Sequence, residues 1–197
     1  MTDAVQDRAR AEFDTDIRDS NAPMTRDEMI ASLREYDIVL PSLGDAFSQE
    51  VFSATDEIRC GLLANFGVGY NHIDVAAARA CGLAVTNTPG AVTDATADVA
   101  MTLLLMSARR AAEGERLVRS GRWEGWHPTQ MLGLHVTGKH VGIVGMGRIG
   151  EAIARRCHFG FGMKVSYLAR SAKDPGFPVY RAKDAASLAE EVDFLVV

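Results

Sequence analysis

The sequence lacks several features that mark particular classes of protein. Its formal net charge is −5 over 197 residues, so no overall positive field would attract nucleic acid. No apolar run approaches the roughly 18 residues that a membrane-spanning helix needs. The stretch MTDAVQDRARAEFDTDIRDS at the N-terminus contains no apolar segment typical of a secretory signal. We therefore expect neither nucleic-acid binding nor membrane insertion.

Cysteine is also scarce. The three cysteines, Cys60, Cys81 and Cys157, are widely spaced and form no paired motif. This spacing argues against a disulfide framework and against a zinc site, and we predict no metal site. It favours a reducing, cytoplasmic compartment, in which all three thiols pack as small hydrophobic residues.

Strands and helices are expected to alternate along the chain, an order typical of a parallel sheet with crossover helices. The strands are expected at residues 37–41, 58–65, 83–88, 141–145, 164–169 and 193–197. The helices are expected at residues 25–36, 48–54, 73–80, 93–110, 148–157 and 185–191, the third of them ended by Gly82. From Val141 onward, the β-α-β-α-β order predicts half of a doubly wound nucleotide-binding fold.

The helix expected at residues 93–110 is unusual because residues 99–106 are apolar on almost every side. Such a helix is normally buried on several faces, which predicts a domain junction or a subunit interface. Thr93 and Asp94 suit its N-terminus. The following stretch, residues 119–134, is expected to be irregular and carries both tryptophans, Trp123 and Trp126.

The stretch VGIVGMGRIG, residues 141–150, joins a predicted strand to a predicted helix through G-x-G-x-x-G spacing. In that context each glycine has a role in dinucleotide binding. Gly145 allows the tight turn, Gly147 lets a pyrophosphate approach the backbone, and Gly150 lets helix and strand pack closely. The helix N-terminus presents free N–H groups to the phosphates. The alternative is a purely structural turn.

The end of the next predicted strand indicates which dinucleotide is bound. An acidic residue about 20 positions after the glycines would bind the ribose hydroxyls of NAD, whereas an arginine would accommodate the extra phosphate of NADP. The sequence there is LARS, with Arg170 and Ser171 and no carboxylate. We therefore favour NADP(H) over NAD(H). The alternative is that Arg170 is simply a solvated charge.

A second glycine-containing loop, in NFGVGYNHID at residues 65–74, also follows a predicted strand and precedes a predicted helix. Open α/β sheets bind ligands at the carboxyl ends of their strands. Gly67 and Gly69 would leave neighbouring backbone amides exposed, and such amides can hold a carboxylate. A plain strand-to-helix turn is the alternative.

Three motifs in this order, NFGVGYNHID, GLAVTNTPGAVTDATADVAMTLLL and VGIVGMGRIGEAIARR, closely resemble the D-isomer-specific 2-hydroxyacid dehydrogenases, in particular the glyoxylate/hydroxypyruvate reductase branch. The resemblance covers roughly residues 25–197. It implies an α/β chain with a flavodoxin-like substrate domain (residues 1–89) that lacks its first strand. It also implies the N-terminal part of a Rossmann NAD(P)-binding domain (residues 90–197), with the active site between the two domains.

The resemblance also implies roles for individual residues. It places the helix from Thr93 and the tryptophan-bearing segment at a homodimer interface. The matched residues are Val68 and Gly69 for the substrate carboxylate, Thr96 beside the nicotinamide, Gly145, Met146, Gly147, Arg148, Ile149 and Gly150 for the pyrophosphate, and Ala169, Arg170 and Ser171 for the adenosine ribose.

The catalytic residues of the family have no counterpart here. Its arginine, glutamate and histidine lie beyond the strand that ends at Val197, so we expect no catalytic residue in this chain and a sequence truncated at both ends. The histidines are expected to be surface or packing residues: His72, His127, His135, His140 and His158. We predict a marginally stable chain that is inactive in hydride transfer.

Two functions are therefore considered. The first is an NAD(P)-dependent 2-hydroxyacid dehydrogenase that reduces a small 2-keto acid such as glyoxylate or hydroxypyruvate, present as a partial chain. The second is a non-catalytic dinucleotide-binding module, such as a redox sensor or a corepressor-like relative.

Overall fold

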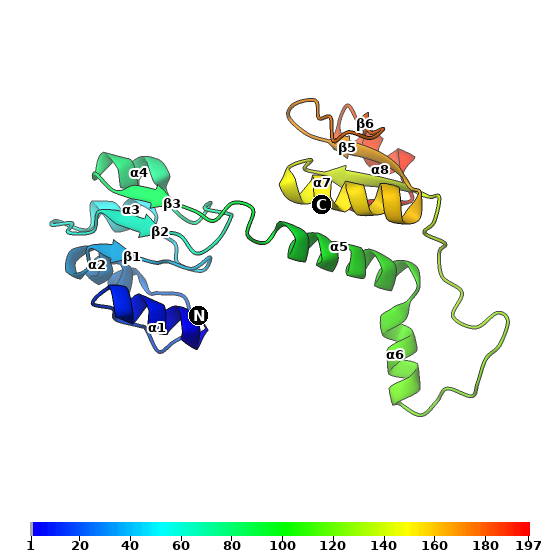
Figure 1. The fold of residues 1–197 in the computed structure, drawn as a ribbon, viewed down its shortest axis with the longest axis horizontal. Coiled ribbons are helices and arrows are strands. Elements are labelled where there is room, and N and C mark those ends of the chain that lie inside the picture. The colour runs from blue at the N-terminus through cyan, green and yellow to red at the C-terminus, as the bar shows by residue number, and fades with distance from the viewer. Residues whose placement is uncertain (1) are drawn as a thin grey trace. The chain divides into compact units, whose positions relative to one another are not determined.

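A computed structural model describes residues 2–197. The chain divides into two compact units, Met1–Pro89 and Gly90–Val197, and each is described by itself. Figure 1 shows that both units combine strands with helices.

The first unit is built on a three-stranded parallel sheet in the order β1-β2-β3. The strands are short: β1 (Ile38–Val39), β2 (Leu62–Ala64) and β3 (Ala84–Thr86). Its helices are α1 (Asp3–Glu12), α2 (Arg26–Glu35), α3 (Gln49–Ser53) and α4 (Val75–Ala80). Helices α2 to α4 line one core, whose fully buried members include Leu33, Phe47 and Leu63, whereas α1 buries no residue.

Local capping explains where these helices begin and end. Thr25 and Glu28 form a capping box, in which each side chain accepts a hydrogen bond from the other residue's backbone N–H. The Asp74 carboxylate accepts from the Ala77 N–H, 2.9 Å away, at the start of α4. Gly82, with φ +84°, follows the end of α4 and confirms the predicted helix stop.

The second unit contains a four-stranded parallel sheet in the order β6-β5-β4-β7. The strands are β4 (His140–Val144), β5 (Lys164–Leu168), β6 (Tyr180–Arg181) and β7 (Phe194–Val196). Counted within this unit the order is 3-2-1-4, as in the first four strands of a doubly wound dinucleotide-binding fold. The helices are α5 (Thr93–Ala108), α6 (Ala111–Arg119), α7 (Arg148–Arg155), a π-helical turn η1 (Arg156–Gly160) and α8 (Ala185–Glu191).

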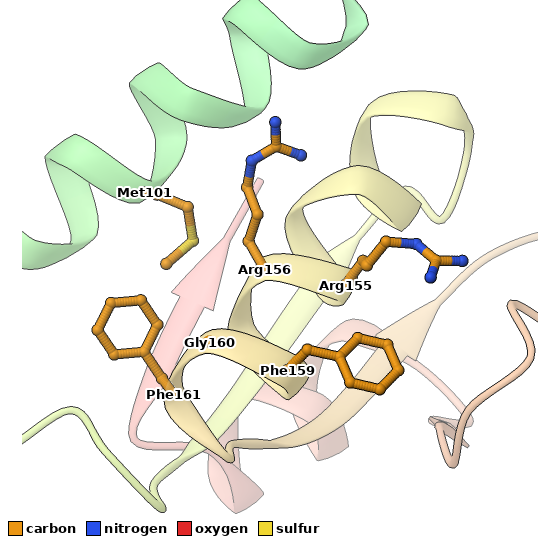
Figure 2. Close-up of a pocket in the computed structure, with 6 residues that line it drawn as sticks. All are labelled: Met101, Arg155, Arg156, Phe159, Gly160 and Phe161. Carbon is orange, nitrogen blue, oxygen red and sulfur yellow. The ribbon is translucent and has the colours of Figure 1, made fainter.

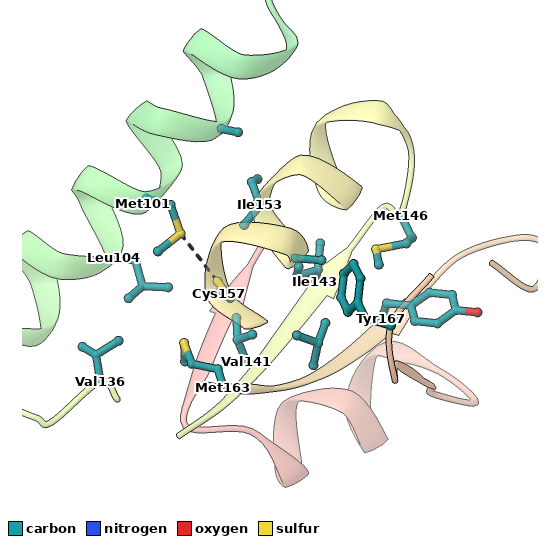
Figure 3. Packing of buried hydrophobic residues seen from close by; sticks show 14 of the residues in the cluster. Met101, Leu104, Val136, Val141, Ile143, Met146, Ile153, Cys157, Met163 and Tyr167 are labelled. Carbon is teal, nitrogen blue, oxygen red and sulfur yellow. Dashed lines mark hydrogen bonds between the residues drawn. The ribbon is translucent and has the colours of Figure 1, made fainter. Parts of the chain in front are cut away.

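The core of the second unit lies where β4 and β5 meet α5 and α7 (Figure 3). Val141, Ile143 and Val165 are almost completely buried, as is Cys157 in η1. Burial raises the pKa of the Cys157 thiol to about 11, so this cysteine is a packing residue rather than a nucleophile. Cys60 is buried as well, but Cys81 is exposed after the last turn of α4, so the prediction that all three thiols are packed was wrong for Cys81.

Within the second unit, helix α5 buries one face, formed by Ala97, Met101, Leu104 and Ala108. The side opposite that face is apolar but exposed: Val99 is 58% exposed and Leu103 is 62% exposed. No described element of the second unit covers this second apolar side, and the domain junction or subunit interface stays a prediction.

The structure also bears on membrane-spanning helices and on clusters of metal-binding side chains. No helix within residues 2–197 is long and apolar enough to cross a membrane. Over the same residues, no three His, Cys, Asp or Glu side chains gather as potential metal ligands.

Candidate dinucleotide and carboxylate sites

The turn between β4 and α7 has the backbone geometry that its glycine spacing predicts. Gly145 has φ +98°, a conformation that favours glycine, and its N–H donates to Leu168 O at 2.9 Å. A Cβ on Gly150 would lie 2.1 Å from Gly145 O, so the close contact between turn and helix requires glycine there. A Cβ on Gly147 would meet nothing within 4 Å. The space beside Gly147 is open to a ligand.

The first turn of α7 presents backbone N–H groups at this open space. Gly147 is the N-cap, and no side chain accepts a hydrogen bond there. The first N–H groups of a helix have no partner within the helix and carry a partial positive charge, which favours a phosphate. Met146 is 2% exposed and Ile149 packs against the core, so both would contact a ligand mainly through their backbone. Arg148 is exposed, and no carboxylate in the described chain pairs with it.

The loop after β5 carries the residues predicted to contact the adenosine ribose. Ala169 is half-buried, whereas Arg170 and Ser171 are exposed. The buried Tyr167 hydroxyl accepts from the Lys173 N–H at 2.8 Å, which fastens the far end of the loop to the sheet. The Arg170 guanidinium has no hydrogen-bond or ion-pair partner within residues 2–197. It is therefore available to an anion.

In the first unit, side-chain amides hold the carbonyl groups of the loop after β2. Asn65, which is 2% exposed, donates from Nδ2 to Gly67 O at 3.2 Å and to Gly69 O at 2.9 Å. Asn87 donates to Val68 O at 2.8 Å. His72 Nε2 lies 3.0 Å from Asn65 Oδ1 and fixes the orientation of that amide, because only Nδ2 can then face the carbonyls.

The hydrogen bonds of these carbonyls also determine where the neighbouring backbone N–H groups point. In a trans peptide the N–H points opposite to the preceding C=O. The N–H groups of Val68 and Tyr70 therefore point away from Asn65, and the N–H group of Gly69 points away from Asn87. None of these three N–H groups donates to any residue in the described chain. Successive free amides of this kind form a site for a carboxylate.

Three comparisons with known proteins bear on these sites. Residues 101–197 match the family described as D-isomer specific 2-hydroxyacid dehydrogenase, NAD binding domain. The chain is 41% identical over 191 residues to the glyoxylate reductase of Thermococcus kodakarensis, covering 94% of this chain and 56% of that protein. It is 39% identical over 168 residues to the glycerate dehydrogenase of Hyphomicrobium methylovorum, covering 85% of this chain and 51% of that protein.

The chain belongs to the D-isomer specific 2-hydroxyacid dehydrogenase family. Its structure is similar to that of a putative family member from a Polaromonas species, with a TM-score of 0.87 and 36% identity, covering 100% of this chain and 62% of that one. It is also similar to an NADPH-dependent glyoxylate/hydroxypyruvate reductase from Sinorhizobium meliloti, with a TM-score of 0.80 and 33% identity. The match covers 99% of this chain and 59% of that one. The chain spans a little over half the length of the curated relatives it matches.

Three of the five histidines make structural contacts, whereas His127 and His135 are exposed. His72 binds Asn65, and the ring of His140 lies 2.8 Å from both Glu191 O and Ser166 Oγ. His158 stacks on Phe177. Within residues 2–197 no histidine ring is hydrogen-bonded to a carboxylate, so the described chain contains no histidine–glutamate pair.

A separate hollow lies at the other end of α7 from the glycine turn (Figure 2). Its walls come from α5 and from the residues around η1: Met101, Arg155, Arg156, Phe159, Gly160 and Phe161. Its two charges are already engaged, because Arg155 lies over the rings of Phe159 and Phe177 and Arg156 pairs with Asp94 and Asp98. The hollow therefore has an apolar lining with no free charged group to bind a dinucleotide.

Sequence reasoning missed the side chains that orient these loops. Asn87 and Arg181 contact residues 19 and 12 positions away, and no local pattern in a single sequence indicates such contacts. The contacts of Asn65 with Gly67, Gly69 and His72 lie within one loop, but they depend on the conformation of that loop. The one available signal was Asn65, an amide placed directly after the apolar strand residues LLA. A polar side chain at that position must find partners when it is buried.

Proposed function

We propose that this chain provides the dinucleotide-binding and carboxylate-binding parts of a 2-hydroxyacid dehydrogenase that reduces a small 2-keto acid such as glyoxylate or hydroxypyruvate. The observation that carries the proposal is the open space beside Gly147, bounded by the uncapped N-terminus of α7. The relatives named glyoxylate reductase and glycerate dehydrogenase support the substrate class. On this proposal residues 1–89 form the substrate domain and residues 90–197 the cofactor domain.

The cofactor is proposed to be NADP(H) rather than NAD(H). Arg170 and Ser171 stand at the end of β5, where a 2′-phosphate would lie, and the Arg170 guanidinium is unpaired among the described residues. The NADPH-dependent relative from Sinorhizobium meliloti is consistent with this choice. The pyrophosphate would be bound by the turn formed by Gly145, Met146, Gly147, Arg148, Ile149 and Gly150, and Thr96, exposed on α5, would lie beside the nicotinamide.

The roles of this chain in the reaction are binding and orientation. When bound, the cofactor supplies a hydride to the carbonyl carbon of the keto acid. The N–H groups of Val68 and Gly69 would hold the substrate carboxylate, and Asn65 and Asn87 would keep them facing it. Holding both reactants in a fixed geometry supplies a large part of the rate enhancement. We assign no catalytic acid or base among the residues of this chain.

A non-catalytic dinucleotide-binding module is the second candidate. It is favoured by one observation, the lack of a histidine–glutamate pair within residues 2–197. A module of this kind would bind the dinucleotide but would not bind a 2-keto acid. Binding of both ligands therefore separates the two functions.

The proposed assembly is a homodimer, and the proposed compartment is the cytoplasm. Exposed apolar side chains on α5, α6 and the following segment support a subunit interface: Val99, Leu103, Met106, Val118, Trp123, Trp126, Leu132 and Leu134. Free thiols at Cys60, Cys81 and Cys157 suit a reducing compartment.

An NMR titration tests the proposed function. We expect oxamate, a non-reacting analogue of a 2-keto acid, to shift the amide signals of Val68, Gly69 and Tyr70. NADPH should shift those of residues 145–150. Acetamide, which lacks the carboxylate, serves as the control and should leave residues 68–70 unchanged. Shifts with NADPH but none with oxamate would favour the non-catalytic module, and no shift with either ligand would contradict both candidates.

A further inference from the structure

Arg181 lies on the second unit's edge strand and reaches the loop that carries Arg170. Strand β6 pairs in parallel with β5, with Arg181 opposite Tyr167, and the Ala182 N–H donates to Tyr167 O at 2.8 Å. From this position Arg181 Nη2 donates to two successive carbonyl oxygens, those of Ala169 and Arg170, each at 3.0 Å. The side chain therefore joins β6 to the turn after β5. Figure 1 labels the two paired strands.

These two contacts change what the turn can bind. Carbonyl oxygens at the end of β5 are hydrogen-bond acceptors, and the hydroxyl groups of an unphosphorylated ribose are donors that could use them. With Arg181 bound to both carbonyls, one of the two lone pairs of each oxygen is already engaged, which leaves fewer acceptor positions for a ribose hydroxyl. A negatively charged phosphate would otherwise be repelled by the carbonyl oxygens, and the guanidinium offsets that repulsion.

Arg181 also retains donors of its own. A guanidinium has five N–H groups, and the contacts from Nη2 use two of them. The other three have no partner within residues 2–197. A planar group with free N–H donors matches the oxygens of a phosphate.

The acidic residues near Arg170 and Arg181 in the sequence do not form ion pairs with them. Neither Arg170 nor Arg181 forms an ion pair in the described chain. The closest acidic residues along the sequence have other partners: Asp174 accepts from the Gly176 N–H at 3.0 Å, and Asp184 caps α8 by accepting from the Ser187 N–H at 2.8 Å. Two unpaired guanidinium groups at one strand end are suited to a shared anion.

We propose that Arg181 is a specificity-determining residue for the 2′-phosphate of NADP(H). It occupies acceptor positions that the ribose of NAD(H) could use and supplies donors that a phosphate uses, so it disfavours NAD(H) and favours NADP(H). This inference rests on the proposed dinucleotide-binding function and adds a second cation to Arg170.

Calorimetric titration of the 197-residue chain with NADPH and NADH tests the proposal. In Arg181→Ala we expect NADPH affinity to fall about tenfold or more, while NADH affinity stays within threefold or rises. Arg181→Gln should lose NADPH affinity as well, because it lacks the positive charge, while its amide can still donate to the turn, which guards against a folding defect. Circular dichroism should show all variants folded.

Lys183→Ala provides the matched control, because it removes one exposed positive charge two residues away that makes no contact with the turn. We expect its preference for NADPH to equal that of the wild type. The inference is overturned if both Arg181 variants keep the wild-type preference, or if Lys183→Ala loses as much. If the wild type binds NADPH no better than NADH, the inference also fails, whereas binding of neither dinucleotide overturns the proposed function itself.

Discussion

Gly147 and Gly150 lie three residues apart in one turn, but different constraints act on them. Gly150 is buried, and its α-carbon faces the Gly145 carbonyl so closely that any Cβ would overlap it. Gly147 has an extended backbone (φ −88°, ψ −163°) that other residues can adopt, and its surroundings are open. Packing therefore requires glycine at position 150, whereas ligand access is the reason for glycine at position 147.

A stability measurement separates these two roles. We expect Gly150→Ala to destabilise the second unit by about 1–3 kcal/mol or more, because backbone at the contact must move. Gly147→Ala should unfold at the wild-type temperature, since its added methyl group meets nothing. Thermal unfolding followed by circular dichroism measures both. Equal stability of Gly150→Ala and the wild type would contradict the packing argument.

Asn65 is the residue on which the proposed carboxylate site depends most. Asn65→Asp would replace a donor that binds two carbonyls by an acceptor facing the same oxygens. We expect a loss of about 1–3 kcal/mol in the stability of the first unit, and loss of the oxamate-induced shifts at residues 68–70. Urea unfolding and the NMR titration give the two quantities.

Asn71→Asp is the control for Asn65→Asp, because it makes the same chemical change at an exposed position in the same loop. It should keep both the stability and the oxamate shifts. If the two variants behave alike, the added negative charge rather than the lost amide is responsible, and the positioning role of Asn65 is wrong.

At the scale of elements, Asp193 fixes the start of β7 against the start of β4. Its Oδ2 accepts from the His140 N–H at 2.9 Å, and its own N–H donates to His140 O at 2.9 Å. The hydrogen bond from the His140 backbone, together with the attraction of Lys139, holds the pKa of the Asp193 carboxyl below its ordinary value of 3.8. The charged form of Asp193 is therefore the one that stabilises the folded state.

The pH dependence of stability follows from the sign of that shift. A depressed pKa contributes stability above the ordinary value of 3.8, and this contribution is lost as the pH falls through the lower, folded-state value. Asp193→Asn keeps an oxygen acceptor but has no charge to lose. We expect the wild type to be the more stable protein at pH 7 in urea unfolding, with the difference shrinking below pH ~4. A difference that is independent of pH would contradict this assignment.

The elements differ in how far the sequence predicts them. Strand β4, helix α7 and helix α8 lie within a few residues of their predicted ranges, because apolar periodicity, the glycine turn and the Asp184 cap all agree. Helix α6 was missed because it begins after Arg110 in a left-handed conformation with no capping side chain. Strand β6 was missed because its two residues, Tyr180 and Arg181, carry no alternating pattern.

The residues of the candidate site also differ in how far the sequence predicts their roles. The roles of Gly145 and Gly150 in the turn could be predicted because backbone conformation and close packing leave a direct mark on residue type. The contacts made by Asn87 and Arg181 could not, since Asn87 is 19 residues from Val68 and Arg181 is 12 from Ala169. Only folding brings these partners together.

At the scale of the whole molecule, the exposed apolar side of α5 is the feature that the chain alone leaves unexplained. Val99→Arg would place a charge in the proposed dimer interface, and we expect it to shift the monomer–dimer equilibrium toward monomer by at least tenfold. Analytical ultracentrifugation measures this. Val5→Arg makes the same change at a position of similar exposure on α1, 50% against 58%, and should leave the dimer intact. A monomeric wild type would contradict the proposed assembly.

The central claim is that the turn between β4 and α7 binds a dinucleotide through the open space at Gly147. Titration of the wild-type chain and Gly147→Ala with NADPH, followed by fluorescence, tests it most directly. We predict saturable binding to the wild type and at least tenfold weaker binding to the variant, with equal unfolding temperatures, because the methyl group fills space that the pyrophosphate needs. Equal affinity of the two proteins for NADPH, or no binding by the wild type, would contradict the account.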